Sequence, residues 1–121
     1  MVKVLFDTNI VIDMLKGVPA ARDVLSNYPQ RAVSIITWME FMVGTPAALT
    51  NATQDFLKGF ELIGLDENVA EQAVVIRKAH RLKLPDAVIW ATAKVNGLSL
   101  LTRDTKGFPR QHPDIIVPYV L

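Results

Sequence analysis

Cysteine is absent from the 121 residues, which excludes disulfide bonds and thiolate chemistry and fits a reducing compartment. An excess of charge of one sign is also lacking, because thirteen basic and twelve acidic residues leave a formal charge of +1. That balance by itself neither favours nor excludes a polyanionic ligand. No apolar run approaches the length that spans a bilayer, and the N-terminus carries no export-signal pattern. We therefore expect a cytoplasmic protein without a membrane segment.

Hydrophobic residues, by contrast, are abundant. They make up 50% of the chain, and the mean hydropathy is +0.26, which is high for a small protein. A chain of this length can bury a core of its own, so we predict a single domain over residues 1–121. Some apolar surface should be covered by a partner rather than by water. Part of the cluster Trp38, Met39, Phe41 and Met42 is a candidate protein-binding surface, since one helix cannot hide all four side chains.

Strand-like and helix-like segments alternate along the chain. Short β-branched and apolar runs predict strands over residues 2–6, 32–36, 62–65, 99–102 and 115–117. Capping residues and helical periodicity predict helices over residues 10–15, 19–27, 37–43, 46–60, 66–81 and 85–95. This order indicates an α/β fold, a mostly parallel central sheet flanked by helices in three α/β/α layers.

Four acidic residues stand in apolar surroundings at the ends of these elements. Asp7 closes the run Val2–Phe6, and Asp86 opens an apolar helix after Leu84-Pro85. Glu40 lies within the apolar segment 35–43, and Asp104 follows the segment 98–103. A carboxylate is costly to bury unless its charge is compensated. The ends of strands and helices are also where α/β folds collect their ligands.

Taken singly, several of these acids have simpler interpretations. Asp7 could be only an N-cap and Asp104 only a turn residue. Glu40 shares a helical face with Ile36 and Val43, which predicts that it is buried. The other acids are expected on polar faces, in caps or in loops, and Asp13 in particular is expected to be exposed.

Taken together, the four acids predict a metal site. The carboxyl ends of parallel strands meet at one edge of a sheet, so these carboxylates should converge there. Charges 4 Å apart repel by about 4 kcal/mol at an effective dielectric near 20, which raises pKa values or demands a cation. An all-oxygen site suits Mg²⁺ or Mn²⁺. Zinc is disfavoured because the chain offers only His80 and His112 as softer ligands.

Basic residues crowd the same segments. Four precede Asp86 and three surround Asp104, namely Arg77, Lys78, Arg81 and Lys83, then Arg103, Lys106 and Arg110. Cations beside an acidic pocket suit a polyanion whose scissile phosphate meets a metal. Solvated helix faces with extended aliphatic stems explain any single one of them equally well.

Four stretches together resemble the PIN-domain nucleases, and within them the VapC-like toxins of bacterial and archaeal toxin–antitoxin pairs. They are Leu5-Phe6-Asp7-Thr8-Asn9-Ile10, the segment Ser34–Phe41 around Glu40, the segment Leu84–Ala93 around Asp86, and the segment Leu101–Phe108 around Asp104. They occur in the family's order and cover essentially the whole chain.

The resemblance implies an Mg²⁺- or Mn²⁺-dependent endoribonuclease with Asp7, Glu40, Asp86 and Asp104 as its acidic quartet. It also implies a homodimer and an antitoxin partner that masks the site. One position departs from the family, because Gly107 stands where members often carry Asp and Asp104 where they often carry Asn. Either the acid has moved or Asp104 serves alone as the fourth ligand.

The corresponding hypothesis is hydrolysis of an RNA phosphodiester by a metal-activated water. Thr8, Asn9 and Thr102 are expected to orient the carboxylates, and Arg103 or Lys106 to neutralise the phosphate backbone. Two rivals remain open at this point. One is a phosphoacceptor module of the receiver type, which is also α/β with a carboxylate after its first strand, and the other is a catalytically silent PIN-fold scaffold.

Overall fold

The computed structural model describes residues 2–121 and has one five-stranded sheet whose strands are all parallel, in the order β3-β2-β1-β4-β5. The strands are β1 (Lys3–Phe6), β2 (Gln30–Ser34), β3 (Glu61–Ile63), β4 (Ser99–Leu101) and β5 (Ile115–Ile116). The predicted parallel sheet is confirmed. A receiver module has the order 2-1-3-4-5 instead, so the receiver interpretation is wrong.

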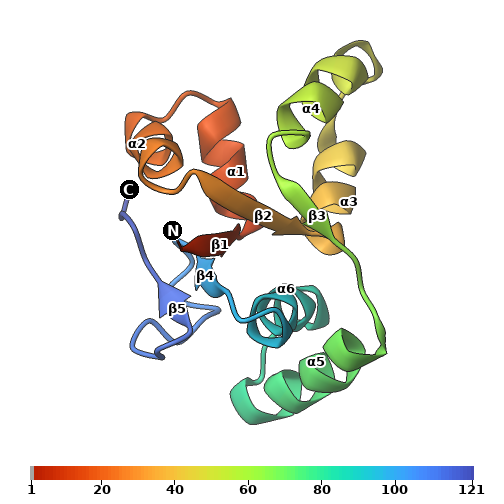
Figure 1. Ribbon diagram of the computed structural model, residues 1–121, viewed down its shortest axis with the longest axis vertical. Helices are drawn as coiled ribbons and strands as arrows, with labels where there is room; N and C mark the ends of the chain where they lie inside the picture. The colour runs from red at the N-terminus through yellow and green to blue at the C-terminus, as the bar shows by residue number, and fades with distance from the viewer. Residues whose placement is uncertain (1) are drawn as a thin grey trace.

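Helices cover both faces of this sheet (Figure 1). They are α1 (Thr8–Leu15), α2 (Pro19–Asn27), α3 (Ile35–Gly44), α4 (Thr50–Leu57), α5 (Glu67–His80) and α6 (Leu84–Val95), with a short 3₁₀ helix η1 (Ala47–Leu49) between α3 and α4. Helices α1 and α2 lie on one side and α5 and α6 on the other, which confirms the three-layer α/β/α architecture. No helix of the described chain combines the length and apolar character that a bilayer crossing requires.

Strand alternation divides the core between the two faces. In β1, Val4 and Phe6 join the cluster under α1 and α2, whereas Leu5 joins the cluster under α5 and α6. All three side chains are fully buried. A strand covered on both faces must be apolar at every position, which explains why the first strand reads as a continuous hydrophobic run.

The second strand ends earlier than predicted. It stops at Ser34 rather than at residue 36, because the Ser34 hydroxyl accepts hydrogen bonds from the backbone N–H groups of Ile36 and Thr37. This N-cap starts α3 directly at the end of β2. The helix that carries Glu40 therefore begins at the carboxyl-terminal edge of the sheet.

The order of the strands marks one edge position for ligands. The chain builds the sheet outward from β1 to β2 and β3, then crosses to the other side of β1 for β4 and β5. Ligands of open α/β sheets bind beyond the carboxyl ends of the strands at such a reversal. Here the reversal lies between β1 and β4, whose last residues Phe6 and Leu101 are paired in register.

Candidate metal and phosphate site

Asp7 lies at this reversal, between the end of β1 and the start of α1. Its side chain is only 4% exposed, and its backbone N–H donates to the carbonyl of Leu101 over 2.8 Å. One carboxylate oxygen accepts from the Thr8 N–H at 2.8 Å, and the other accepts from the Thr102 hydroxyl at 2.7 Å. Asp7 is therefore an N-cap, as the simpler interpretation held, but a deeply buried one.

Burial raises the pKa of Asp7 from its ordinary value of 3.8 to about 6. The hydrogen bonds from Thr102 and Thr8 lower the pKa, but they only partly offset the loss of hydration. The negative charges of Asp86 and Asp104 raise it further. The two hydrogen bonds do not fully compensate the buried charge of Asp7, so a bound cation would stabilise the ionised carboxylate.

Asp86 occupies the first turn of α6 and is half-buried. Burial is the largest cause that raises its pKa, followed by the charges of Asp104 and Glu40, while the Lys83 ammonium lowers it. The predicted apolar stripe is confirmed, because Ile89, Trp90 and Ala93 of the same helix are buried.

Asp104 is held in the turn after β4. Its Oδ1 accepts from the N–H groups of Lys106 at 3.1 Å and Gly107 at 2.9 Å, and its own N–H donates to the Thr102 hydroxyl at 3.0 Å. A Cβ on residue 107 would lie 2.6 Å from Oδ2 of Asp104. Gly107 therefore leaves the space that the Asp104 carboxylate occupies, so the two residues that depart from the family pattern are matched to each other.

Glu40 is exposed, so the prediction that it is buried is wrong. Of the neighbours that suggested burial, Val43 turns outward with it and is 88% exposed, whereas Ile36 is partly buried against the core. Its Oε1 accepts from the Thr8 hydroxyl at 2.8 Å, and the Thr8 and Thr37 hydroxyls lie 3.0 Å apart. Thr8, the residue next to Asp7, thus connects Glu40 to the start of α1. Thr37, which is fully buried, was not singled out from the sequence.

Charge repulsion links the four carboxylates in pairs, because Asp86 and Asp104 raise the pKa of Asp7, and Asp104 and Glu40 raise the pKa of Asp86. They are less tightly gathered than expected, because within residues 2–121 no three histidine, aspartate or glutamate side chains are close enough to hold one ion. Mg²⁺ is commonly bound by one or two carboxylates, with water and substrate phosphate completing its shell. The all-oxygen donor set and the uncompensated charge of buried Asp7 fit such an ion.

Thr102 and Asn9 link these carboxylates to one another. The Thr102 hydroxyl donates to Asp7 and accepts from the Asp104 N–H, so it joins the two strand ends. The Asn9 amide donates to the same hydroxyl at 3.4 Å, and its oxygen accepts from the Arg103 N–H at 3.4 Å. Three of these four contacts, those of Asp7 and Asn9, join the start of α1 to the segment after β4.

Asp13 is buried, with 3% of its surface exposed, so its predicted exposure is wrong. The Arg103 guanidinium donates to both carboxylate oxygens, and the Tyr119 hydroxyl donates to Oδ2 at 2.7 Å. Burial alone would raise the pKa of Asp13, but these donors outweigh it and hold the pKa below its ordinary value. Arg103 is thereby engaged away from the acidic rim, whereas Lys106 is exposed and lines a cavity with Asp86 and Asp104.

Comparisons with known proteins identify the family of this chain. The PIN domain family matches residues 4–111. Ribonuclease VapC19 of Mycobacterium tuberculosis is 31% identical over 124 residues, which cover 95% of this chain and 98% of the relative. Ribonuclease VapC10 of the same species is 32% identical over 114 residues, covering 88% and 86%. A solved chain from a toxin–antitoxin complex of Klebsiella pneumoniae is 42% identical with a TM-score of 0.91, covering 98% of this chain and 99% of that one. The chain therefore belongs to the PIN-domain family and is a VapC-like member of it.

Proposed function

We propose that this protein is an endoribonuclease that hydrolyses RNA phosphodiester bonds with Mg²⁺ or Mn²⁺ and acts as the toxin of a toxin–antitoxin pair. The observation that carries the proposal is the buried Asp7 carboxylate beside two further acids at the sheet reversal. The two relatives above are named ribonucleases, and the Klebsiella chain comes from a toxin–antitoxin complex. An RNA substrate also accords with the expected cytoplasmic location.

Asp7, Asp86, Glu40 and Asp104 would hold the cation, directly or through water. When bound, such an ion lowers the pKa of a coordinated water and offsets charge on the phosphate. The chain's part is to keep these carboxylates in place. Backbone N–H groups hold Asp104, and the Thr8 hydroxyl holds Glu40.

Thr8, Asn9 and Thr102 would act as positioning residues, since each donates to a carboxylate or to the group that orients one. For the phosphate backbone, the sequence offered Arg103 and Lys106. We assign this role mainly to Lys106, because the Arg103 guanidinium already binds Asp13.

The direct test is cleavage of a single-stranded RNA in the presence of Mg²⁺ or Mn²⁺ by the unmodified chain and by Asp86→Asn. We expect the variant to lose at least a hundred-fold in rate, in keeping with the loss of one charge-stabilising group. The matched control is Asp55→Asn, which changes an exposed acid on α4 and should cleave normally. Undiminished cleavage by Asp86→Asn would show that the site is assigned incorrectly.

For the antitoxin partner, we propose the apolar groove beside Glu40. The groove has a volume of about 250 Å³ between α1, α3 and η1, and its walls include Ile12, Leu15, Phe41 and Leu49. Three of these side chains are at least one-third exposed, namely Ile12, Leu15 and Leu49. A protein bound there would cover Glu40 and block the approach of RNA.

This partner can be tested by co-expression with the small protein encoded by the adjacent upstream reading frame. We expect a stable complex without nuclease activity, and we expect Leu49→Asp to release the partner while the free chain still cleaves RNA.

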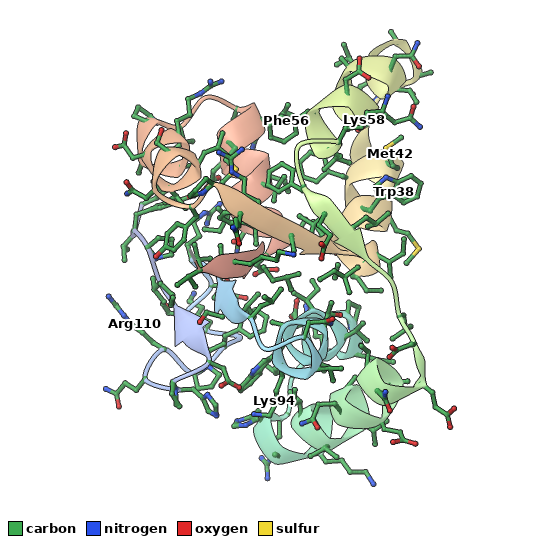
Figure 2. All side chains as sticks on the ribbon, in the orientation of Figure 1. Trp38, Met42, Phe56, Lys58, Lys94 and Arg110 are labelled. Carbon is green, nitrogen blue, oxygen red and sulfur yellow. The ribbon has the colours of Figure 1, made fainter. Side chains whose placement is uncertain are left out.

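The outer side of α3, with the partly buried Trp38 and Met42, is a second apolar region at the surface (Figure 2). For the proposed homodimer, sedimentation of the purified chain gives the oligomeric state directly.

A further inference from the structure

Arg81 has an unusual backbone conformation. It ends α5 with φ 56° and ψ 36°, and it is the only residue other than glycine with positive φ in the described chain. Glycine or asparagine is preferred at this position, because a Cβ crowds the backbone in the left-handed region. The backbone role, donation of the Arg81 N–H to the Arg77 carbonyl at 2.8 Å, needs no side chain. The arginine at this strained position is therefore a candidate for a role of its side chain.

Arg81 is exposed and lines a cavity of about 340 Å³ next to the acidic rim. Its lining brings Arg81 together with Lys83 and Lys106, and it includes the carboxylates of Asp86 and Asp104. The volume is within the range of sites that bind small molecules or parts of a polymer. One cavity is thus lined by two of the acids proposed to hold the cation and by three basic residues.

The charges in this cavity suit two successive phosphates. A phosphate at the acids requires the cation between them, whereas the next phosphate along the strand can bind the basic side chains directly. Lys83 and Asp86 both line this cavity and are three residues apart in the chain, so the basic and acidic groups adjoin there.

We propose that this cavity binds the phosphodiester adjacent to the scissile one on a single RNA strand, and that Arg81 is a phosphate-positioning residue. The inference rests on the proposed RNA-cleaving function. It assigns Arg81 to substrate binding, in addition to Lys106.

The test compares Arg81→Gly, Arg81→Lys and a control, Lys58→Ala. Lys58 follows α4, at the opposite end of the molecule from α5 (Figures 1 and 2). Binding of a fluorescently labelled single-stranded oligoribonucleotide is measured by anisotropy in EDTA, so that no cleavage occurs, between 50 and 300 mM salt. Thermal unfolding of each variant is measured in the same buffer.

Loss of one phosphate contact should reduce the slope of log K against log salt by about 0.7, which is about five-fold in affinity at 0.1 M salt. We expect this reduction for Arg81→Gly, while its melting temperature stays the same or rises because the backbone strain is relieved. Arg81→Lys should retain the slope, and Lys58→Ala should match the unmodified chain in both measurements.

Normal RNA binding by Arg81→Gly would overturn the proposal, as would a chain that binds no RNA. So would a fall in melting temperature with no recovery of binding in Arg81→Lys, since that pattern belongs to a structural residue. The cleavage test with Asp86→Asn is separate. If Asp86→Asn abolishes cleavage but Arg81→Gly leaves RNA affinity unchanged, only the adjacent-phosphate site is refuted.

Discussion

The replacement Asp7→Asn should stabilise the metal-free protein at neutral pH. Burial raises the pKa of Asp7 from 3.8 to about 6, and a shift of one pKa unit corresponds to about 1.36 kcal/mol. The folded chain thus prefers the protonated carboxyl by about 3 kcal/mol. This preference destabilises the fold fully above pH 6, where Asp7 is charged in both states, and the penalty disappears as the pH falls towards 4. Asparagine resembles the neutral acid at every pH.

The assay is thermal or urea unfolding of both proteins in EDTA at pH 4 and pH 8. At pH 4 we expect nearly equal stabilities, and at pH 8 we expect Asp7→Asn to be more stable by up to about 3 kcal/mol, or roughly 10 °C in Tm for a chain of this size. Addition of Mg²⁺ at pH 8 should stabilise the unmodified chain but not the variant, because an ion bound only by the folded state shifts the equilibrium by mass action.

Asp55→Asn is the control, since Asp55 is exposed and its pairing with Lys58 contributes little. A metal-free Asp7→Asn that is less stable than the unmodified chain at pH 8 would refute the reasoning. Its hydrogen bonds from Thr8 and Thr102 would then outweigh the cost of burying the charge.

Three further predictions follow from the same contacts. First, the cleavage rate of the unmodified chain should fall about ten-fold per pH unit on the acid side, because a protonated carboxyl ligand does not bind the ion. The midpoint of this pH profile should lie below pH 6 at saturating Mg²⁺ and move to higher pH as the Mg²⁺ concentration is lowered. A midpoint that does not depend on Mg²⁺ would contradict the assignment. Second, Gly107→Ala should displace the Asp104 carboxylate, because the new Cβ would lie 2.6 Å from Oδ2 of Asp104. The variant should keep its fold, as judged by circular dichroism, but lose as much cleavage activity as Asp104→Ala does. Full activity would show that the Asp104 carboxylate is not needed at this position. Third, Tyr119→Phe should lower the free energy of unfolding by about 2 kcal/mol in urea, since it removes a hydrogen bond to the buried Asp13 carboxylate, whereas an unchanged midpoint would mean that Arg103 alone satisfies that carboxylate.

Much of the site's scaffold was predictable because it rests on local patterns. An apolar run that ends in Asp7 is both a doubly covered strand and the N-cap of the next helix, and each feature is legible within a few residues. The same holds for Asp86, which follows Pro85 in the first turn of α6 and shares a stripe with buried Trp90. Once strands and helices alternate, the right-handed parallel connection brings strand ends to one edge, so a shared rim could be predicted too.

Other features depend on contacts between distant segments and had no local signal. The exposure of Glu40 follows from how α3 lies against the rest of the fold, since periodicity alone cannot distinguish a buried face from one bordering a groove. The strained Arg81 conformation is equally invisible, because arginine gives no warning of a left-handed backbone.

By itself the sequence determined the strands, most of the helix boundaries, the parallel sheet and the four acids near its carboxyl-terminal edge. These follow from hydrophobic periodicity and capping, which act over a few residues. Only the tertiary structure decided that Asp13 is buried against Arg103 and Tyr119, partners 90 and 106 residues away. It also decided that Asp104 fills the space left by Gly107. The physical reason is that the burial and pairing of a charge depend on groups brought together by folding, which no short window of sequence contains.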